Sequence, residues 1–147
     1  MNLYDRSVVR LLDVASIERA RSVKTYPAGS TLIQVSATDG KLRYMDESCE
    51  VAQKFAVIEP DRARVSPAYL FWALGIAVPP FLARYQTTMN IQMDVFQHLR
   101  LEIHNDRETQ DEIVRLFAAV DEQIDGIQLD IDRFKEFKKW HLDTMFV

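Results

Sequence analysis

Apolar residues recur every three or four positions along the C-terminal third of the chain. Between Asn105 and Leu142 they fall at alternating steps of four and three residues, at Ile113, Phe117, Val120, Ile124, Ile127, Ile131 and Phe134. A repeat of about 3.5 residues places these side chains on one face of a helix and is typical of paired helices. No proline interrupts the segment. The pattern predicts one long helix over residues 106–142, with these seven residues as a continuous apolar seam.

The charged residues at the two ends of this segment support the helix. Asn105 is followed three residues later by Glu108, which is the spacing of a capping box. Acidic residues crowd the first turns and lysines crowd the last, the polarity that the helix dipole favours. Gly126 lies inside the helix, where it either allows a partner helix to approach closely or is a tolerated weak point.

The seam requires an apolar partner. The helix either folds back on its own domain or pairs with another long helix. We favour pairing, because about 37 residues at a rise of about 1.5 Å each make a rod as long as a small domain is wide. The partner is then a second copy of this chain or a similar helix of another protein. We therefore predict the seam as a dimer interface, with either of these two helices as its partner.

The first part of the chain carries shorter patterns that are typical of strands. Residues 31–35 predict a strand, and residues 41–44 predict its partner after the turn signal Asp39-Gly40. Residues 51–58 are also β-prone, and Pro60 ends that stretch.

A helix and a further strand follow. Ser66 and Pro67 have the residue types of an N-cap and a first helical position. The pair Pro79-Pro80 either stops this helix or starts a second short one. Apolar and polar residues then alternate over residues 99–104, which predicts a half-buried strand. The fold class is therefore α+β, a small mixed domain followed by a long C-terminal coiled-coil helix.

Charge is divided unevenly along the chain. The 147 residues are 48% hydrophobic and 27% charged, enough to bury a core, and the net charge is -4. Residues 1–105 hold 12 Lys/Arg and 11 Asp/Glu, whereas residues 106–147 hold 6 Lys/Arg and 11 Asp/Glu. The acidity thus belongs to the helix, and the near-neutral domain leaves room for a basic patch.

Motifs of catalysis are missing from the sequence. The single cysteine, Cys49, excludes a disulfide framework and a metal site of several thiolates, and its acidic neighbours disfavour a thiolate nucleophile. The three histidines lack metal-ligand spacing, and four scattered glycines build no phosphate loop. We expect no catalytic residue, no metal and no cofactor. The N-terminus has no signal-peptide pattern and the longest apolar run, over residues 69–81, is broken by glycine and proline. We therefore expect a cytoplasmic protein without a membrane span.

Two polar loops interleave basic and aromatic residues, over residues 36–44 and 84–92. Their side chains are of the types that donate to phosphates and base edges. The alternative is an ordinary solvated loop. The candidate DNA-binding residues are Thr38, Lys41, Arg43, Tyr44, Arg84, Tyr85, Gln86, Thr88, Asn90 and Gln92.

The order of these features resembles the specificity subunits of type I restriction-modification systems. In that family a target-recognition domain ends in a strand, and a Gln-x-x-Ile pattern opens a long conserved helix. Here the strand corresponds to Leu99–Ile103 and the helix opening to Gln110–Ile113. The closing segment Phe137–Phe146 is similar to the end of the family's helix. Upstream, Leu11–Ala15 resembles the opening of the domain, and Val57–Pro60 with Ser66–Phe71 its central strand and helix.

The resemblance implies a target-recognition-like DNA-binding domain over residues 1–105 and a dimerisation helix over residues 106–147. A full subunit of the family carries two such domains and two helices, so this chain resembles half a subunit. Two copies would then pair through their helices as a homodimer and read an inverted repeat in double-stranded DNA. The resemblance further implies a non-catalytic protein that recruits an adenine methyltransferase subunit, with a restriction subunit as a further partner. The domain is short for the family, which keeps open an alternative: an interaction or regulatory protein that pairs with specificity or methyltransferase subunits without reading DNA.

Overall fold

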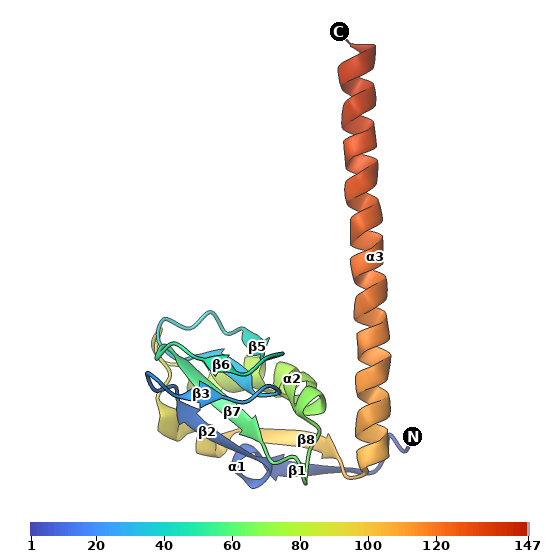
Figure 1. Cartoon of the computed structure of the whole chain (residues 1–147). Coiled ribbons are helices and arrows are strands. Elements are labelled where there is room, and N and C mark those ends of the chain that lie inside the picture. The colour runs from blue at the N-terminus through green and yellow to red at the C-terminus, as the bar shows by residue number, and fades with distance from the viewer. Residues whose placement is uncertain (147) are drawn as a thin grey trace. The chain divides into compact units, whose positions relative to one another are not determined.

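The chain forms two compact units, Met1–Asp111 and Glu112–Val147, in the computed structural model, which describes residues 1–146. The predicted boundary, between residues 105 and 106, lies at the start of the last helix. Figure 1 shows the elements, which in chain order are β1 (Arg6–Arg10), α1 (Leu11–Val14), β2 (Ala15–Arg19), β3 (Thr25–Tyr26), β4 (Thr31–Gln34), β5 (Leu42–Tyr44), β6 (Cys49–Glu50), β7 (Phe55–Pro60), α2 (Pro67–Tyr85), the 3-10 helix η1 (Met93–His98), β8 (Arg100–His104) and α3 (Arg107–Met145). This arrangement confirms the α+β class with a long C-terminal helix.

The strands pair antiparallel in three sheets, ordered β2-β7-β4-β5, β1-β8 and β3-β6. The predicted hairpin is confirmed, because β4 pairs β5 with Thr31 opposite Tyr44 and Ile33 opposite Leu42. The half-buried strand is also confirmed, since Leu101 and Ile103 of β8 are buried while their polar neighbours Arg100 and Glu102 are exposed. β1 pairs β8, so segments from both ends of the first unit lie side by side (Figure 1).

Apolar side chains fill the space between the sheets and α2. One cluster of buried residues comprises Ala20, Tyr26, Met45, Val51 and Val57, with Leu32 and Phe55 packed against it. The buried face of α2 presents Tyr69, Leu70, Leu74, Val78, Phe81 and Leu82. The Phe71 ring of α2 meets the Tyr44 ring of β5 edge-on, with centroids 5.6 Å apart. Helix α2 therefore packs against the strand that one of the candidate loops leads into.

Both alternatives predicted for Pro79-Pro80 are wrong, because α2 continues through them to Tyr85. Both prolines lie on the exposed side of the helix. The carbonyls that lose their intrahelical donor belong to Gly75 and Ile76, which are also exposed, so water can satisfy them. Buried side chains before and after the prolines hold the two halves of the helix on the same core.

Two predicted boundaries also differ from the structure. Strand β7 begins at Phe55, not at residue 51, because the Phe55 N–H donates to the Ala52 carbonyl and closes a turn. At the start of α3, the cap is Asp106 and not Asn105. The Asp106 carboxylate accepts the backbone N–H of Thr109 at 2.8 Å, whereas the Asn105 side chain bonds Asp5 and Ser7.

Helix α3 carries the seam along its length. Ile113 is 9% exposed and thus already buried within the chain, unlike the rest of the seam. The other six residues are exposed, Phe117 by 36%, Val120 by 43%, Ile124 by 56%, Ile127 by 60%, Ile131 by 42% and Phe134 by 73%. None of the helices in residues 1–146 has the length and apolar character that crossing a membrane requires.

Candidate nucleic-acid interface

Backbone hydrogen bonds join the two candidate loops into one surface. The Thr38 N–H donates to the Met89 carbonyl at 2.8 Å, and the Ile91 N–H donates to the Val35 carbonyl at 2.8 Å. The β4–β5 loop and the segment after α2 therefore lie side by side. The sequence predicted each loop separately, and the structure brings them together.

Several candidate side chains in these loops hold the loops themselves. The Asn90 Oδ1 atom accepts the N–H of Ala37, whose φ of 49° is in the left-handed region that residues with a Cβ rarely adopt. The Thr88 hydroxyl donates to the Asn90 carbonyl and accepts the Asn90 N–H. The Thr38 hydroxyl accepts the N–H of Gly40. These three side chains shape the surface, and their hydrogen bonds compete with contacts to a base.

The turn before β5 carries a carboxylate. Asp39 accepts the backbone N–H of Lys41 at 3.1 Å and an N–H of the Arg43 guanidinium at 2.7 Å. The Lys41 N–H first, and Arg43 in addition, hold the pKa of Asp39 below its usual value. Asp39 is therefore ionised at neutral pH, and it offsets the charge of Arg43.

The aromatic candidates are largely engaged in packing. Tyr44 is half-buried against Phe71, and the Arg43 guanidinium lies over the Phe55 ring, 5.0 Å from its centroid. Tyr85 stacks on the imidazole of His98, with centroids 5.5 Å apart and planes 8° apart. These contacts fix the positions of Arg43, Tyr44 and Tyr85 on the surface.

The remaining candidates are more available to a ligand. The backbone N–H of Gln86 ends α2 by donating to the Leu82 carbonyl, and Gln92 precedes η1 as its N-cap. Lys41 and Gln92 are exposed, and Arg84 is exposed at the last turn of α2. Of the ten predicted residues, Lys41, Arg84 and Gln92 are the best placed to contact a ligand.

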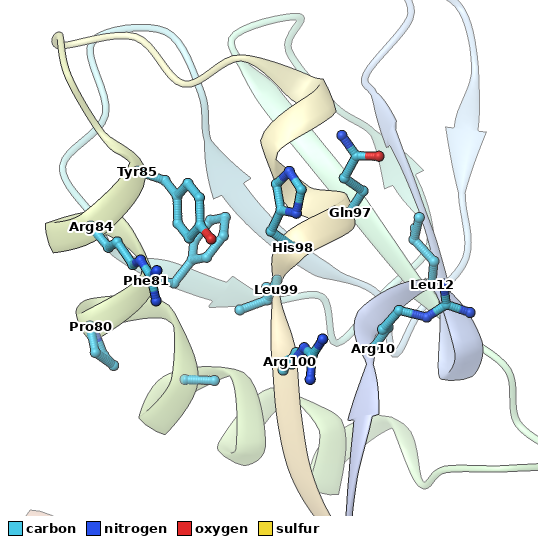
Figure 2. Close-up of a pocket in the computed structure, with 11 residues that line it drawn as sticks. Arg10, Leu12, Pro80, Phe81, Arg84, Tyr85, Gln97, His98, Leu99 and Arg100 are labelled. Atoms are coloured by element: carbon cyan, nitrogen blue, oxygen red, sulfur yellow. The ribbon is translucent and has the colours of Figure 1, made fainter.

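Beyond Tyr85 the surface deepens into a hollow of about 880 Å³ between α2, η1 and the β1–β8 pair. It is lined by Arg10, Leu12, Ala77, Pro80, Phe81, Arg84, Tyr85, Gln97, His98, Leu99 and Arg100. Figure 2 shows these side chains, which come from elements far apart in the sequence. Each of the three walls contributes at least one arginine or histidine to the lining, and no residue in this lining is acidic.

Four residues of this lining were not among the residues predicted from the sequence: Arg10, Gln97, His98 and Arg100. The alternation over residues 99–104 does place Arg100 on the exposed side of its strand, which is the one signal that pointed to it. The other half of the hollow comes from the pairing of β1 with β8, and nothing in the local pattern of either segment predicts that pairing. The described chain contains no group of three or more His, Cys, Asp or Glu side chains placed to hold a metal ion.

The fold is a small α+β domain that leads into a long helix. The model of the family described as "Type I restriction modification DNA specificity domain" matches residues 8–132. The chain therefore belongs to this family, as the resemblance in its sequence predicted. Specificity subunits of type I systems are the non-catalytic component, in agreement with the expectation that this chain is not an enzyme.

Solved structures share the fold. The S subunit of a type I restriction-modification system from M. genitalium has 12% sequence identity and a TM-score of 0.72, over 86% of this chain and 41% of that one. A chain from a study of complex assembly and conformational transition of the type I R-M system has 17% identity and a TM-score of 0.70, over 86% of this chain and 41% of that one. The HsdS subunit from Thermoanaerobacter tengcongensis has 16% identity and a TM-score of 0.65, over 87% and 40%. This chain thus spans about two fifths of the length of these structures. No curated protein matches it.

Proposed function

We propose that this chain is a DNA-recognition component of a type I restriction-modification system, with one recognition domain and one pairing helix. The observation that carries the proposal is the family match over residues 8–132, which spans the strand-rich unit and most of α3. The proposal assigns DNA recognition to the first unit and assembly to the second. The joined loops and the adjoining basic hollow support the first assignment.

Exposure of the seam supports assembly through α3. Ile124, Ile127 and Phe134 are each more than half exposed, and they lie along one face of a single helix. A continuous exposed apolar face of this kind marks an interaction surface. We propose that its occupant is the α3 helix of a second copy, and that Ile113, buried within the chain, contributes little to this interface.

A symmetric pair of chains has a consequence for the DNA site. Two identical recognition units related by a two-fold axis read the same half-site in opposite orientations. We propose that the homodimer reads an inverted repeat in double-stranded DNA and recruits an adenine methyltransferase subunit, and that a restriction subunit joins the same assembly.

A genome-wide map of adenine methylation tests this function. The methyltransferase subunit of the system is expressed in one host with this chain and in another without it. We expect a methylated inverted-repeat motif in the first host only, because the enzyme requires a recognition component to find its sites. Cells that carry this chain without the methyltransferase are the control, and they should show no methylation at the motif.

The same map distinguishes the alternative of an interaction or regulatory protein. The excess of acidic residues in α3 and the structural duties of Thr38, Thr88 and Asn90 favour that alternative. Under it, the chain adds no motif, and an existing motif is weakened when the chain competes for the methyltransferase or for a full specificity subunit. Either of these results would contradict DNA recognition by this chain.

A further inference from the structure

We propose that the hollow lined by Arg84 and Arg100 holds a phosphate group of the DNA backbone. The inference rests on the proposed function and deepens it, because it assigns the contact that positions the duplex to residues outside the predicted loops. Contacts to phosphate position a protein on DNA without reading its sequence. The hollow would therefore contribute affinity equally at every DNA sequence.

Arginines from three elements line the hollow. Arg84 comes from the last turn of α2, Arg100 from the first residue of β8 and Arg10 from the end of β1 (Figure 2). Guanidinium groups donate in a planar fork that matches phosphate oxygens. The Gln97 amide and the His98 ring add further polar groups to the same wall. A small anion in the hollow would meet donors from several sides.

Two like charges face each other across β1 and β8. Arg10 lies directly opposite Arg100 in the antiparallel register. Residues in that position project from the same face, and like charges placed so are destabilising. Asp13 offsets one of the two charges, since its carboxylate accepts from the Arg10 Nε and Nη2 atoms at 3.1 and 2.9 Å. A bound anion would offset the other.

The positive charge of Arg100 has no carboxylate partner among the described residues. Across residues 1–146 its side chain forms no ion pair, and it is exposed. The Arg84 guanidinium has only a ring contact within the described part of the chain, lying over Tyr85 at 5.5 Å from the ring centroid. Because neither side chain is tied to a carboxylate, both can turn to a ligand at little cost in broken interactions.

The hollow is continuous with the candidate loops. Arg84 and Tyr85 belong both to the predicted DNA-binding set and to the lining of the hollow. The segment that follows them, residues 86–92, is bonded to the β4–β5 loop. We therefore place the base edges of the duplex at the loops and its backbone at the hollow. This continuity favours a DNA phosphate over an acidic segment of a partner protein.

Salt-dependent binding of a labelled duplex of random sequence tests the assignment with the full-length chain. The double variant R84Q/R100Q removes two charges. We expect it to bind about tenfold or more weakly at about 50 mM salt, and the slope of log affinity against log salt to fall by roughly one, because one phosphate contact is lost. The variant R84K/R100K keeps both charges and should retain most of the slope.

The matched control is R21Q/K24Q, which removes two charges elsewhere. Arg21 and Lys24 both pair with Glu18 and line neither the hollow nor the loops. This control should keep the wild-type slope. Circular dichroism of every variant verifies that the fold is intact, so a weakened affinity is read as a lost contact.

Three outcomes would overturn the assignment. An unchanged slope in R84Q/R100Q, beside normal wild-type binding, rejects the hollow and leaves the proposed function standing. Inorganic phosphate or an oligo-glutamate peptide could raise the thermal midpoint of the wild type but not of R84Q/R100Q, while both proteins bind the duplex equally well. The hollow would then be a site for a free anion or for a protein. No binding of any duplex by the wild type even at low salt rejects both this inference and the proposed DNA recognition.

Discussion

Gln110 illustrates how one buried side chain joins three elements of the first unit. Its Oε1 atom accepts the Ser66 N–H at 3.0 Å and its Nε2 atom donates to the His104 carbonyl at 2.8 Å. Gln110 is 1% exposed and Ser66 is 7% exposed, so the Ser66 N–H would be buried without a partner in the absence of Gln110. Gln110 thus ties the first turn of α3 to the start of α2 and the end of β8. The Gln-x-x-Ile pattern pointed to this position, but the sequence did not show which groups the amide satisfies.

Asp106 supplies a pH-dependent part of the stability of the same junction. Hydrogen bonds from the Thr109 hydroxyl and backbone N–H hold the pKa of Asp106 below its usual value of about 3.8. A carboxyl with a lowered folded-state pKa stabilises the fold above its unfolded pKa, and that stabilisation is lost as the pH falls through the folded pKa. We expect Asp106→Ala to lower the thermal midpoint at pH 7, by a margin that shrinks below about pH 3.8. Thermal melts followed by circular dichroism measure it.

The comparison variant is Asp106→Asn. Asparagine caps helices well but does not titrate in this range. It should therefore keep a midpoint near that of the wild type at pH 7, and its margin over Asp106→Ala should change little with pH. A difference between wild type and Asp106→Ala that stays constant from about pH 7 to about pH 3 would contradict the role of the carboxylate.

At the scale of elements, periodic patterns predicted most of what folds locally. The alternation over residues 99–104 and the turn signal at Asp39-Gly40 yielded β8 and the β4–β5 hairpin, because both patterns depend on near neighbours. The prediction for the proline pair in α2 was wrong because its outcome depends on tertiary packing and not on near neighbours. Whether a helix survives two lost hydrogen bonds depends on which face is buried, and that is decided by the sheets it packs on.

The seam of α3 makes a prediction about assembly. Ile124 lies on the seam and is 56% exposed, whereas Leu129 lies on a different face of α3 and is 53% exposed. We expect Ile124→Asp to convert a dimer into monomers, because a carboxylate at a seam position is buried without a partner in the pair. Light scattering coupled to size-exclusion chromatography measures the mass.

The matched change Leu129→Asp carries the same charge to a position outside the seam and should leave the dimer intact. A Cβ atom added at Gly126 would meet nothing within 4 Å beyond the helix's own backbone, so Gly126→Ala is tolerated in the single chain. A wild-type protein that is monomeric at micromolar concentration, or an Ile124→Asp variant of unchanged mass, would show that the seam does not pair with itself.

For the whole molecule, the candidate site was only partly accessible from the sequence. The loop residues were found by type, since donors for phosphates and bases are recognisable one by one. The hollow beside them was not found, because Arg10 and Arg100 become neighbours only when β1 pairs β8. The division of charge was evident at once, with an acidic segment over residues 106–147 and a near-neutral remainder. That division agrees with separate duties for the two units.

Symmetry leads to the last prediction, which concerns stoichiometry on DNA. If two chains pair through α3, a duplex with both halves of the inverted repeat binds two recognition units of one dimer, and the second contact forms at a high effective concentration. We expect two chains per duplex by native mass spectrometry, and an affinity about 100-fold or more above that for a duplex with one half-site. In Ile124→Asp this advantage should vanish while the half-site affinity persists, because the substitution lies on α3 and leaves the first unit unchanged. A complex of one chain with an asymmetric motif would instead contradict pairing of this chain with itself.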